Sequence, residues 1–189
     1  MPRLSLPALR MRFFAAEIAG RPWGQDVLLA QVRYRCRGWN GHYADPVHDT
    51  TRALDALARL APRAPVVLIG HSMGARAALA AAGGDTVRGV VALAPWCPPG
   101  EPVAHLRGKA AVFLHDEDDT VTSAQQTWAF ARRARTAGAE VQTVAMPAGG
   151  HAMLRGAHRW HRLAADYTAA ILTWGCRPAE TGHHGHRAR

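Results

Sequence analysis

The sequence predicts an α/β fold, a mostly parallel, doubly wound sheet with helices on both faces. Three observations predict it: short apolar runs of strand type, longer helical runs that alternate with them, and glycine or proline at the junctions. The 189 residues suit one domain, and a content of 48% hydrophobic and 20% charged residues excludes an intrinsically disordered chain. We expect one domain over residues 1–176 and a disordered, basic and histidine-rich tail over residues 177–189.

The first part of the chain predicts a helix, a strand and a second helix. Residues 8–19 have a helical pattern. Residues 27–36 (VLLAQVRYRC) predict a strand, because apolar and arginine side chains alternate over its second half. Asp45-Pro46 is typical of a helix start, with proline in the first turn, and Pro62 marks the end of that helix.

Strands and helices then alternate to the end of the domain. Short apolar runs predict four strands, at residues 66–69, 90–94, 110–114 and 141–146. An alanine-rich helix after the first of them ends at glycines, and a second helix is expected over residues 123–137. The last helix carries an apolar stripe at steps of three or four residues, which we expect in the core: Trp160, Leu163, Tyr167, Ile171 and Trp174.

Composition and charge narrow the functional classes. The net charge is +9, but the arginines are spread along the chain, which is typical of a solvated basic surface and does not predict nucleic acid as the partner. The cysteines (Cys36, Cys97 and Cys176) are odd in number and far apart, so neither a disulfide framework nor a metal site is expected. No apolar run approaches the ~18 residues of a membrane span, and the first residues do not form the apolar stretch of a secretory signal. We therefore expect a cytoplasmic protein.

The segment after the first apolar strand carries a candidate nucleophile. Gly70-His71-Ser72-Met73-Gly74 is a G-x-S-x-G pattern between a strand and a helix, in a turn so tight that side chains at 70 and 74 would collide with neighbouring backbone. We expect the Ser72 hydroxyl to be exposed at the helix N-terminus, with the backbone N–H of Met73 directed at a developing oxyanion. The alternative is an ordinary serine in a glycine-rich turn.

A serine hydroxyl needs a base, and the base needs a carboxylate to orient it. His151 follows two glycines directly after the last strand, and these would let the loop bring its imidazole to Ser72. Two carboxylates after the strand at residues 110–114 are candidates for the acid, with Asp119 the first choice and Asp116 the second. The turn between them lacks the midway glycine of a calcium loop, so no metal is expected there.

The chain order Ser72, Asp119, His151 is that of the α/β-hydrolase superfamily. From about residue 8 to residue 175 the sequence resembles a single-domain member, similar to small esterases and to dienelactone-hydrolase-like and serine-aminopeptidase-like proteins. LHDEDDTV resembles the family's acid motif H-G-x-x-D-x-V, with Asp116 in the glycine position and Asp119 in the acid position. GGHAML resembles its histidine loop, and RYRCRGWNG followed by ADPVHD resembles the elements just ahead of its nucleophile.

The N-terminal end of the chain departs from the family pattern. In this family a central strand precedes the first helix seen here, and it ends in a loop, often His-Gly or His-Gly-Gly, that gives a second oxyanion N–H. No such motif precedes Ser72. The usual sheet order places that strand between those at residues 27–36 and 66–69. Two hypotheses follow: the sequence is an incomplete version of a longer hydrolase, or a reduced form in which the strand at 27–36 closes the gap.

The resemblance implies a serine hydrolase that cleaves carboxylic esters, or thioesters or short peptides, through a Ser-His-Asp triad and an acyl-enzyme, without a cofactor. The stretch from Pro95 to Gly108 is too short for a cap domain. We therefore expect an open site in which Trp96 and His71 contact a small-molecule substrate. The alternative is a hydrolase-fold binding protein whose catalysis is impaired because the strand with the oxyanion loop is missing.

Overall fold

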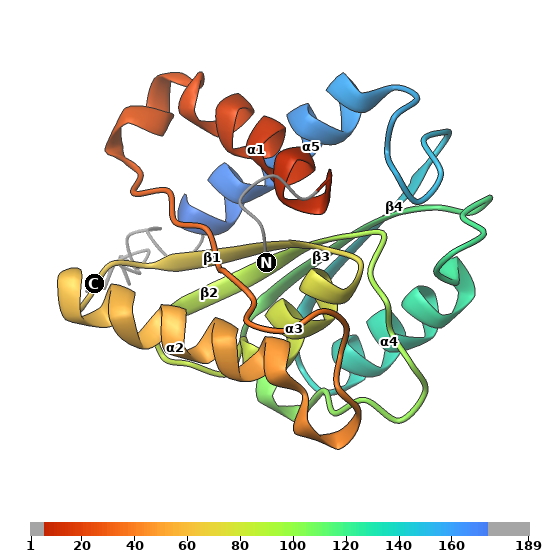
Figure 1. Cartoon of the computed structure of the whole chain (residues 1–189), viewed down its shortest axis with the longest axis horizontal. Helices are drawn as coiled ribbons and strands as arrows, with labels where there is room; N and C mark the ends of the chain where they lie inside the picture. The colour runs from red at the N-terminus through yellow and green to blue at the C-terminus, as the bar shows by residue number, and fades with distance from the viewer. Residues whose placement is uncertain (1–5, 174–189) are drawn as a thin grey trace, which may run out of the picture.

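The computed structural model describes residues 6–173, in which helices cover both faces of one parallel sheet (Figure 1). The α-helices are α1 (Leu6–Ala19), α2 (Asp45–Leu60), α3 (Met73–Ala81), α4 (Ala124–Thr136) and α5 (Ala157–Thr173). The strands are β1 (Val66–His71), β2 (Val87–Leu93), β3 (Ala110–Asp116) and β4 (Glu140–Met146). Three short 3-10 helices lie in the connections of this part of the chain: η1 (Pro22–Asp26), η2 (Gly41–Tyr43) and η3 (Ala104–Leu106).

The strands pair in parallel in the order β1-β2-β3-β4, as the apolar runs predict. β2 and β3 are central, and all of their residues are buried except Arg88, which explains why their sequences are almost wholly apolar. β1 and β4 form the two edges of the sheet within the described residues, and their side chains are more exposed. Parallel pairing brings the carboxyl ends of all the strands to the same edge of the sheet.

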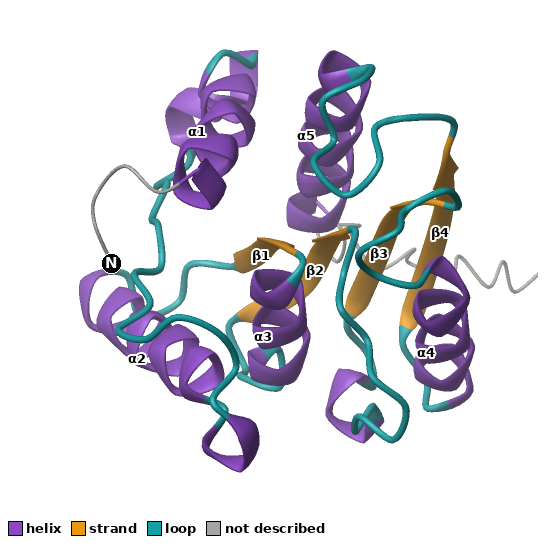
Figure 2. Ribbon diagram, turned by 45° about the vertical axis from the view of Figure 1, so that its right-hand side comes forward, coloured by secondary structure: helices purple, strands orange, loops and turns teal. Residues whose placement is uncertain are grey.

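Alternate side chains of the central strands point into two separate cores. Phe113 and its neighbours on one face pack with α3 and α4, whereas Leu114 and its neighbours on the other face pack with α1 and α5. Figure 2 shows the same division, with α1 and α5 on one side of the sheet and α2, α3 and α4 on the other. The α5 stripe predicted from sequence lies in the second core, where Trp160 and Ile171 are buried. The doubly wound fold is therefore confirmed.

The prediction of a strand over residues 27–36 is wrong. Residues 27–34 are an irregular segment that pairs with no strand, and Leu28 and Leu29 are exposed. The segment is attached to α2 instead, because Asp49 accepts hydrogen bonds from both the backbone N–H and the Nε of Arg35 (2.9 and 2.6 Å). The hypothesis that this segment closes the sheet beside β1 is therefore wrong.

Some expectations concern residues outside the described part. The tail at 177–189, Trp174 and Cys176 lie outside the described residues. Cys36 is exposed, Cys97 is buried, and both are free thiols. No helix within residues 6–173 has the length and apolar character needed to cross a membrane.

Candidate active site

Ser72 occupies a strained turn between the end of β1 and the start of α3. Its φ of 55° and ψ of −120° are rare for a residue with a side chain, and such strain persists only where surrounding contacts enforce it. The Ser72 N–H donates to the carbonyl of Leu93 (3.0 Å), which ties the turn to β2. The Ser72 carbonyl accepts from the N–H groups of Ala75, Arg76 and Trp96 (3.1, 3.1 and 3.2 Å). The backbone of the serine is thus fixed on both sides.

The two glycines of the turn are needed for different reasons. A Cβ at Gly70 would lie 2.5 Å from the carbonyl oxygen of Gly74 and 2.6 Å from the Cα of Ala75, a collision with backbone that no side chain avoids. A Cβ at Gly74 would meet the Tyr34 hydroxyl at 3.3 Å. The expected backbone collision is therefore found at Gly70, whereas the neighbour of Gly74 is a side-chain atom that would need to move only slightly.

Met73 is the first residue of α3. The N–H groups in the first turn of a helix have no carbonyl partner within the helix, so they are available to an anion at the helix N-terminus. The Met73 N–H follows Ser72 directly. A carbonyl group attacked by the serine would place its oxyanion within reach of this donor.

His151 and Asp119 contact each other at the carboxyl edge of the sheet. His151 Nδ1 donates to Asp119 Oδ2 at 2.9 Å, although the two residues come from the loops after β4 and β3. Because a carboxylate only accepts, Nδ1 carries the proton and Nε2 is left as a base. Asp116, the second candidate acid, instead accepts the backbone N–H of Gly150 at 2.7 Å. Asp119 is therefore the carboxylate that touches the imidazole.

The Asp119 carboxylate is fully buried and surrounded by donors. Oδ1 accepts from the N–H groups of Val121 and Thr122, and Oδ2 accepts from His151, His115 and the Thr122 hydroxyl. Burial by itself raises the pKa of Asp119, but the hydrogen bonds from His151, Val121 and Thr122 outweigh it and lower the pKa to about 2. The carboxylate is thus ionised at neutral pH.

A direct contact between His71 and His151 brings the serine turn and the histidine loop together. His71 Nε2 donates to the carbonyl oxygen of His151 at 2.8 Å, and the two ring centroids are 4.8 Å apart. The Ser72 hydroxyl itself makes no hydrogen bond to any of the described residues. Bonds between nucleophile and base are often long in a free enzyme and tighten when substrate binds.

His71 is a neutral imidazole in this setting. Burial lowers its pKa to about 4, with the charges of His151 and Arg10 acting in the same direction. Its Nε2 is occupied by the His151 carbonyl, and its Nδ1 lies 3.5 Å from Nη1 of Arg10. Both ring nitrogens of this predicted substrate-contacting residue therefore already face protein groups.

Trp96 lies directly after β2 in a cluster that the sequence does not indicate. Trp96 is 37% exposed, and the guanidinium of Arg76 lies over both its ring and that of Trp39, at 4.3 and 3.6 Å from the two ring centroids. Arg76 also forms an ion pair with Glu101. Trp39 comes from the loop before α2, so this cluster joins three distant segments.

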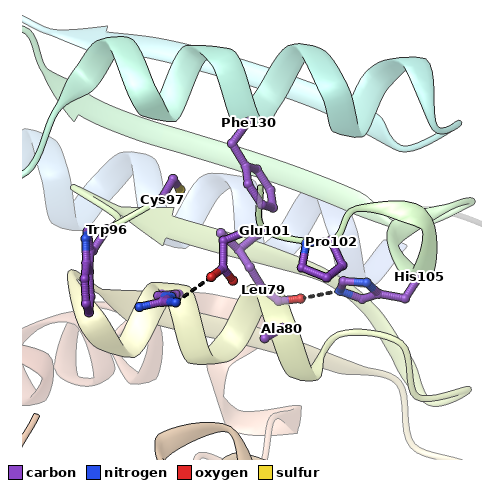
Figure 3. Close-up of a pocket in the computed structure, with 9 residues that line it drawn as sticks. Leu79, Ala80, Trp96, Cys97, Glu101, Pro102, His105 and Phe130 are labelled. Carbon is purple, nitrogen blue, oxygen red and sulfur yellow. Dashed lines mark hydrogen bonds and ion pairs between the residues drawn. The ribbon is translucent and has the colours of Figure 1, made fainter. Parts of the chain in front are cut away.

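A cavity of about 140 Å³ opens beside this cluster (Figure 3). Leu79, Cys97 and Phe130 give it an apolar lining, and its polar residues are Arg76, Glu101 and His105. Burial raises the pKa of the Cys97 thiol to about 12, so the thiol is protonated. This cavity lies between α3, α4 and the loop that follows β2, and Trp96 is one of its lining residues, whereas Ser72 and His151 are not.

Two buried residues of the site were missed by the sequence analysis. His115, at the end of β3, donates from Nε2 to Asp119 at 3.3 Å, and burial lowers the pKa of this histidine. The Thr122 hydroxyl donates to Asp119 at 2.9 Å and lies 3.2 Å from His151 Nδ1. His115 is the first residue of the acid motif, and its place in that motif is the sequence signal that could have identified it. Within residues 6–173, no group of three or more His, Cys, Asp or Glu side chains is placed to hold a metal ion.

The fold agrees with the comparison with known families. A model of the alpha/beta hydrolase family matches residues 7–185. The chain belongs to the alpha/beta hydrolase family. No curated protein matches this alpha/beta hydrolase in sequence.

Solved structures support the same fold. A protein of unknown function from Agrobacterium tumefaciens, described as a candidate alpha/beta hydrolase, is 16% identical with a TM-score of 0.68, covering 89% of this chain and 78% of that one. An alpha-beta serine hydrolase homologue from Coxiella burnetii is 17% identical with a TM-score of 0.63, and the match covers 87% of this chain and 77% of that one. A carboxylesterase from Bacillus cereus is 22% identical with a TM-score of 0.52, and the match covers 69% of this chain and 68% of that one. At such identities the likeness shows the fold.

Proposed function

We propose that this alpha/beta hydrolase is a serine hydrolase that cleaves small carboxylic esters. Ser72 is the nucleophile, His151 the general base and acid, and Asp119 the carboxylate that orients His151. The observation that carries the proposal is the 2.9 Å bond from His151 Nδ1 to a buried Asp119, at the same sheet edge as the strained Ser72. Strained backbone at a residue next to a base is typical of an activated nucleophile.

The reaction has two halves. Ser72 Oγ bonds to the ester carbonyl carbon while its proton passes to His151 Nε2, and the Met73 N–H donates to the oxyanion. The C–O bond to the alcohol then breaks, and the alcohol takes the proton from His151. A water molecule next gives its proton to His151 and attacks the acyl-enzyme. The acid is released as the proton returns to Ser72.

The charge of Asp119 supports these roles. A carboxylate with a pKa of about 2 remains ionised throughout turnover, so it stabilises the imidazolium form of His151 and keeps Nδ1 protonated. Esters, thioesters and short peptides share this chemistry. We favour esters because a structural neighbour, the protein from Bacillus cereus, is a carboxylesterase.

One observation favours a second candidate, a hydrolase-fold protein that binds a small ligand without turnover. The Ser72 hydroxyl makes no hydrogen bond with His151 among the described residues, so the nucleophile and base are not engaged. Such a protein would hold an ester or acid beside Ser72 without forming an acyl-enzyme.

Hydrolysis of 4-nitrophenyl acetate and butyrate by the wild type and by Ser72→Ala separates the two candidates. The proposal predicts turnover with an initial burst of 4-nitrophenol, and its loss in Ser72→Ala. The matched control is Ser123→Ala. This removes a half-buried serine hydroxyl that caps α4, and the variant should keep full activity. Equal rates in the wild type and Ser72→Ala would contradict the proposal, and a folded wild type without turnover would favour the binding protein.

A further inference from the structure

We propose that Asp116 is a positioning residue, an inference that rests on the proposed hydrolase function. It holds the peptide group of Gly150 and thereby presents His151 to Asp119 and Ser72. Asp116 Oδ2 accepts the Gly150 N–H at 2.7 Å, the shortest link between β3 and the histidine loop among those described here. The acceptor is a carboxylate, and charge-assisted bonds of this kind are stronger than bonds between neutral groups.

The histidine loop depends on contacts from outside itself. Gly149 and Gly150 have φ values of +137° and +55°, and two adjacent glycines have wide conformational freedom. Within the loop, the Gly150 carbonyl accepts from the Met153 N–H at 3.2 Å. Side chains from two strand ends hold the peptide groups on either side of this carbonyl: Asp116 accepts the N–H of Gly150, and His71 donates to the carbonyl of His151.

Asp116 can make this contact because of where it lies in the fold. It is the last residue of β3 and is 4% exposed, so its carboxylate is held in place. It stands where the family's acid motif has glycine, as noted above, and glycine has no side chain to reach the loop. Asp116 contacts the backbone of the loop, and the ring of His151 is held by Asp119 and Thr122. Asp116 therefore acts through the loop.

Asp116 also has a local contact that could explain it without any role in catalysis. Its Oδ1 accepts the N–H of Asp118 at 3.0 Å and so caps the turn that leads to Asp119. Asp116→Asn leaves one acceptor oxygen for these two N–H groups, and we expect the shorter contact, to Gly150 at 2.7 Å, to take it. Asp116→Asn then retains the loop contact and loses the turn contact, whereas Asp116→Ala loses both.

Steady-state kinetics on Asp116→Ala and Asp116→Asn distinguishes the two roles. A shift of about 1 Å in a reacting group can cost roughly 100-fold in rate, so we expect Asp116→Ala to lower kcat about 10- to 100-fold with KM nearly unchanged. Asp116→Asn should restore kcat to within about threefold of the wild type. Asp118→Ala is the matched control, because it removes the same charge from an exposed side chain and keeps the backbone N–H.

Three results would overturn the proposal. A folded Asp116→Ala with wild-type kcat would show that the loop contact is dispensable. Equal losses in Ala and Asn would assign the effect to the turn or to the charge. A change in KM alone would place Asp116 against substrate.

Amide hydrogen exchange of Gly150, followed by NMR in the wild type, tests the contact even if Asp116→Ala does not fold. A protected Gly150 amide supports the proposal, and rapid exchange contradicts it. This measurement also separates the proposal from the proposed function. If the wild type lacks esterase activity, the hydrolase assignment fails, whereas Gly150 protection still shows whether Asp116 holds the loop.

Discussion

Replacing Asp119 with Asn is expected to lower kcat for ester hydrolysis about 10⁴-fold, which corresponds to roughly 5 kcal/mol of transition-state stabilisation. The substitution exchanges an acceptor oxygen for an NH2 group that only donates. Oδ2 of Asp119 accepts from two histidines and a hydroxyl, and Oδ1 accepts from two backbone N–H groups. Either orientation of the amide therefore sets donors against donors.

The donors that cannot change decide how the new side-chain amide is oriented. The backbone N–H groups of Val121 and Thr122 cannot change, so the amide oxygen is expected to stay with them and the NH2 group to face His151. His151 then accepts at Nδ1 and carries its proton on Nε2. An imidazole in this tautomer cannot take the proton of Ser72, and this is the cause of the lost rate.

The assay is hydrolysis of 4-nitrophenyl butyrate by wild type, Asp119→Asn and Asp116→Asn, with thermal denaturation to establish folding. KM should change far less than kcat, because Asp119 is fully buried. Asp116→Asn makes the same chemical change three residues away and should keep most of the activity. A folded Asp119→Asn within about tenfold of the wild-type kcat would refute the reasoning. So would a loss confined to Asp116→Asn.

Three further predictions concern stability. Gly70→Ala should cost at least roughly 3 kcal/mol in urea unfolding, because its Cβ meets backbone, whereas Gly74→Ala should cost clearly less; equal costs would contradict this. The folded pKa of His71 (about 4) lies below the ordinary histidine pKa of 6.5, so the unfolded chain binds more protons. The unfolding free energy should therefore fall by up to about 3 kcal/mol from pH 6.5 to 4. His71→Gln should lessen that fall, and an unchanged pH dependence would count against it. Trp160→Phe removes the indole donor to a loop carbonyl and should cost about 1–3 kcal/mol in the same assay, unlike a variant of the exposed Arg159.

The central part of the fold could be predicted because its elements are buried on both faces. β2 is apolar apart from Arg88 and β3 is apolar up to His115, and this signal does not depend on knowing their neighbours. The segment at 27–36 shows the limit of such reasoning. Its alternating side chains suit a strand, but a strand also needs a partner, and Arg35 is bound to Asp49 on α2 instead. Pairing is a long-range property that a local pattern does not contain.

The same distinction applies to the site. The G-x-S-x-G turn and the glycines before His151 are local signals, and the structure brings the loops that carry them into contact through His71. The choice between Asp116 and Asp119 rested on resemblance, and the structure gives each carboxylate a different partner. The contacts of Thr122 and those of Arg76 with two tryptophan rings depend on how distant segments meet in space. No periodicity or spacing indicates them.

Covalent labelling with a fluorophosphonate probe, followed by mass spectrometry of the modified peptide, tests most directly whether Ser72 is an activated nucleophile. We expect one adduct on Ser72 in the folded wild type, none in Ser72→Ala, and much slower labelling in His151→Ala. A folded wild type that stays unlabelled, or that carries its adduct on another residue, would contradict it.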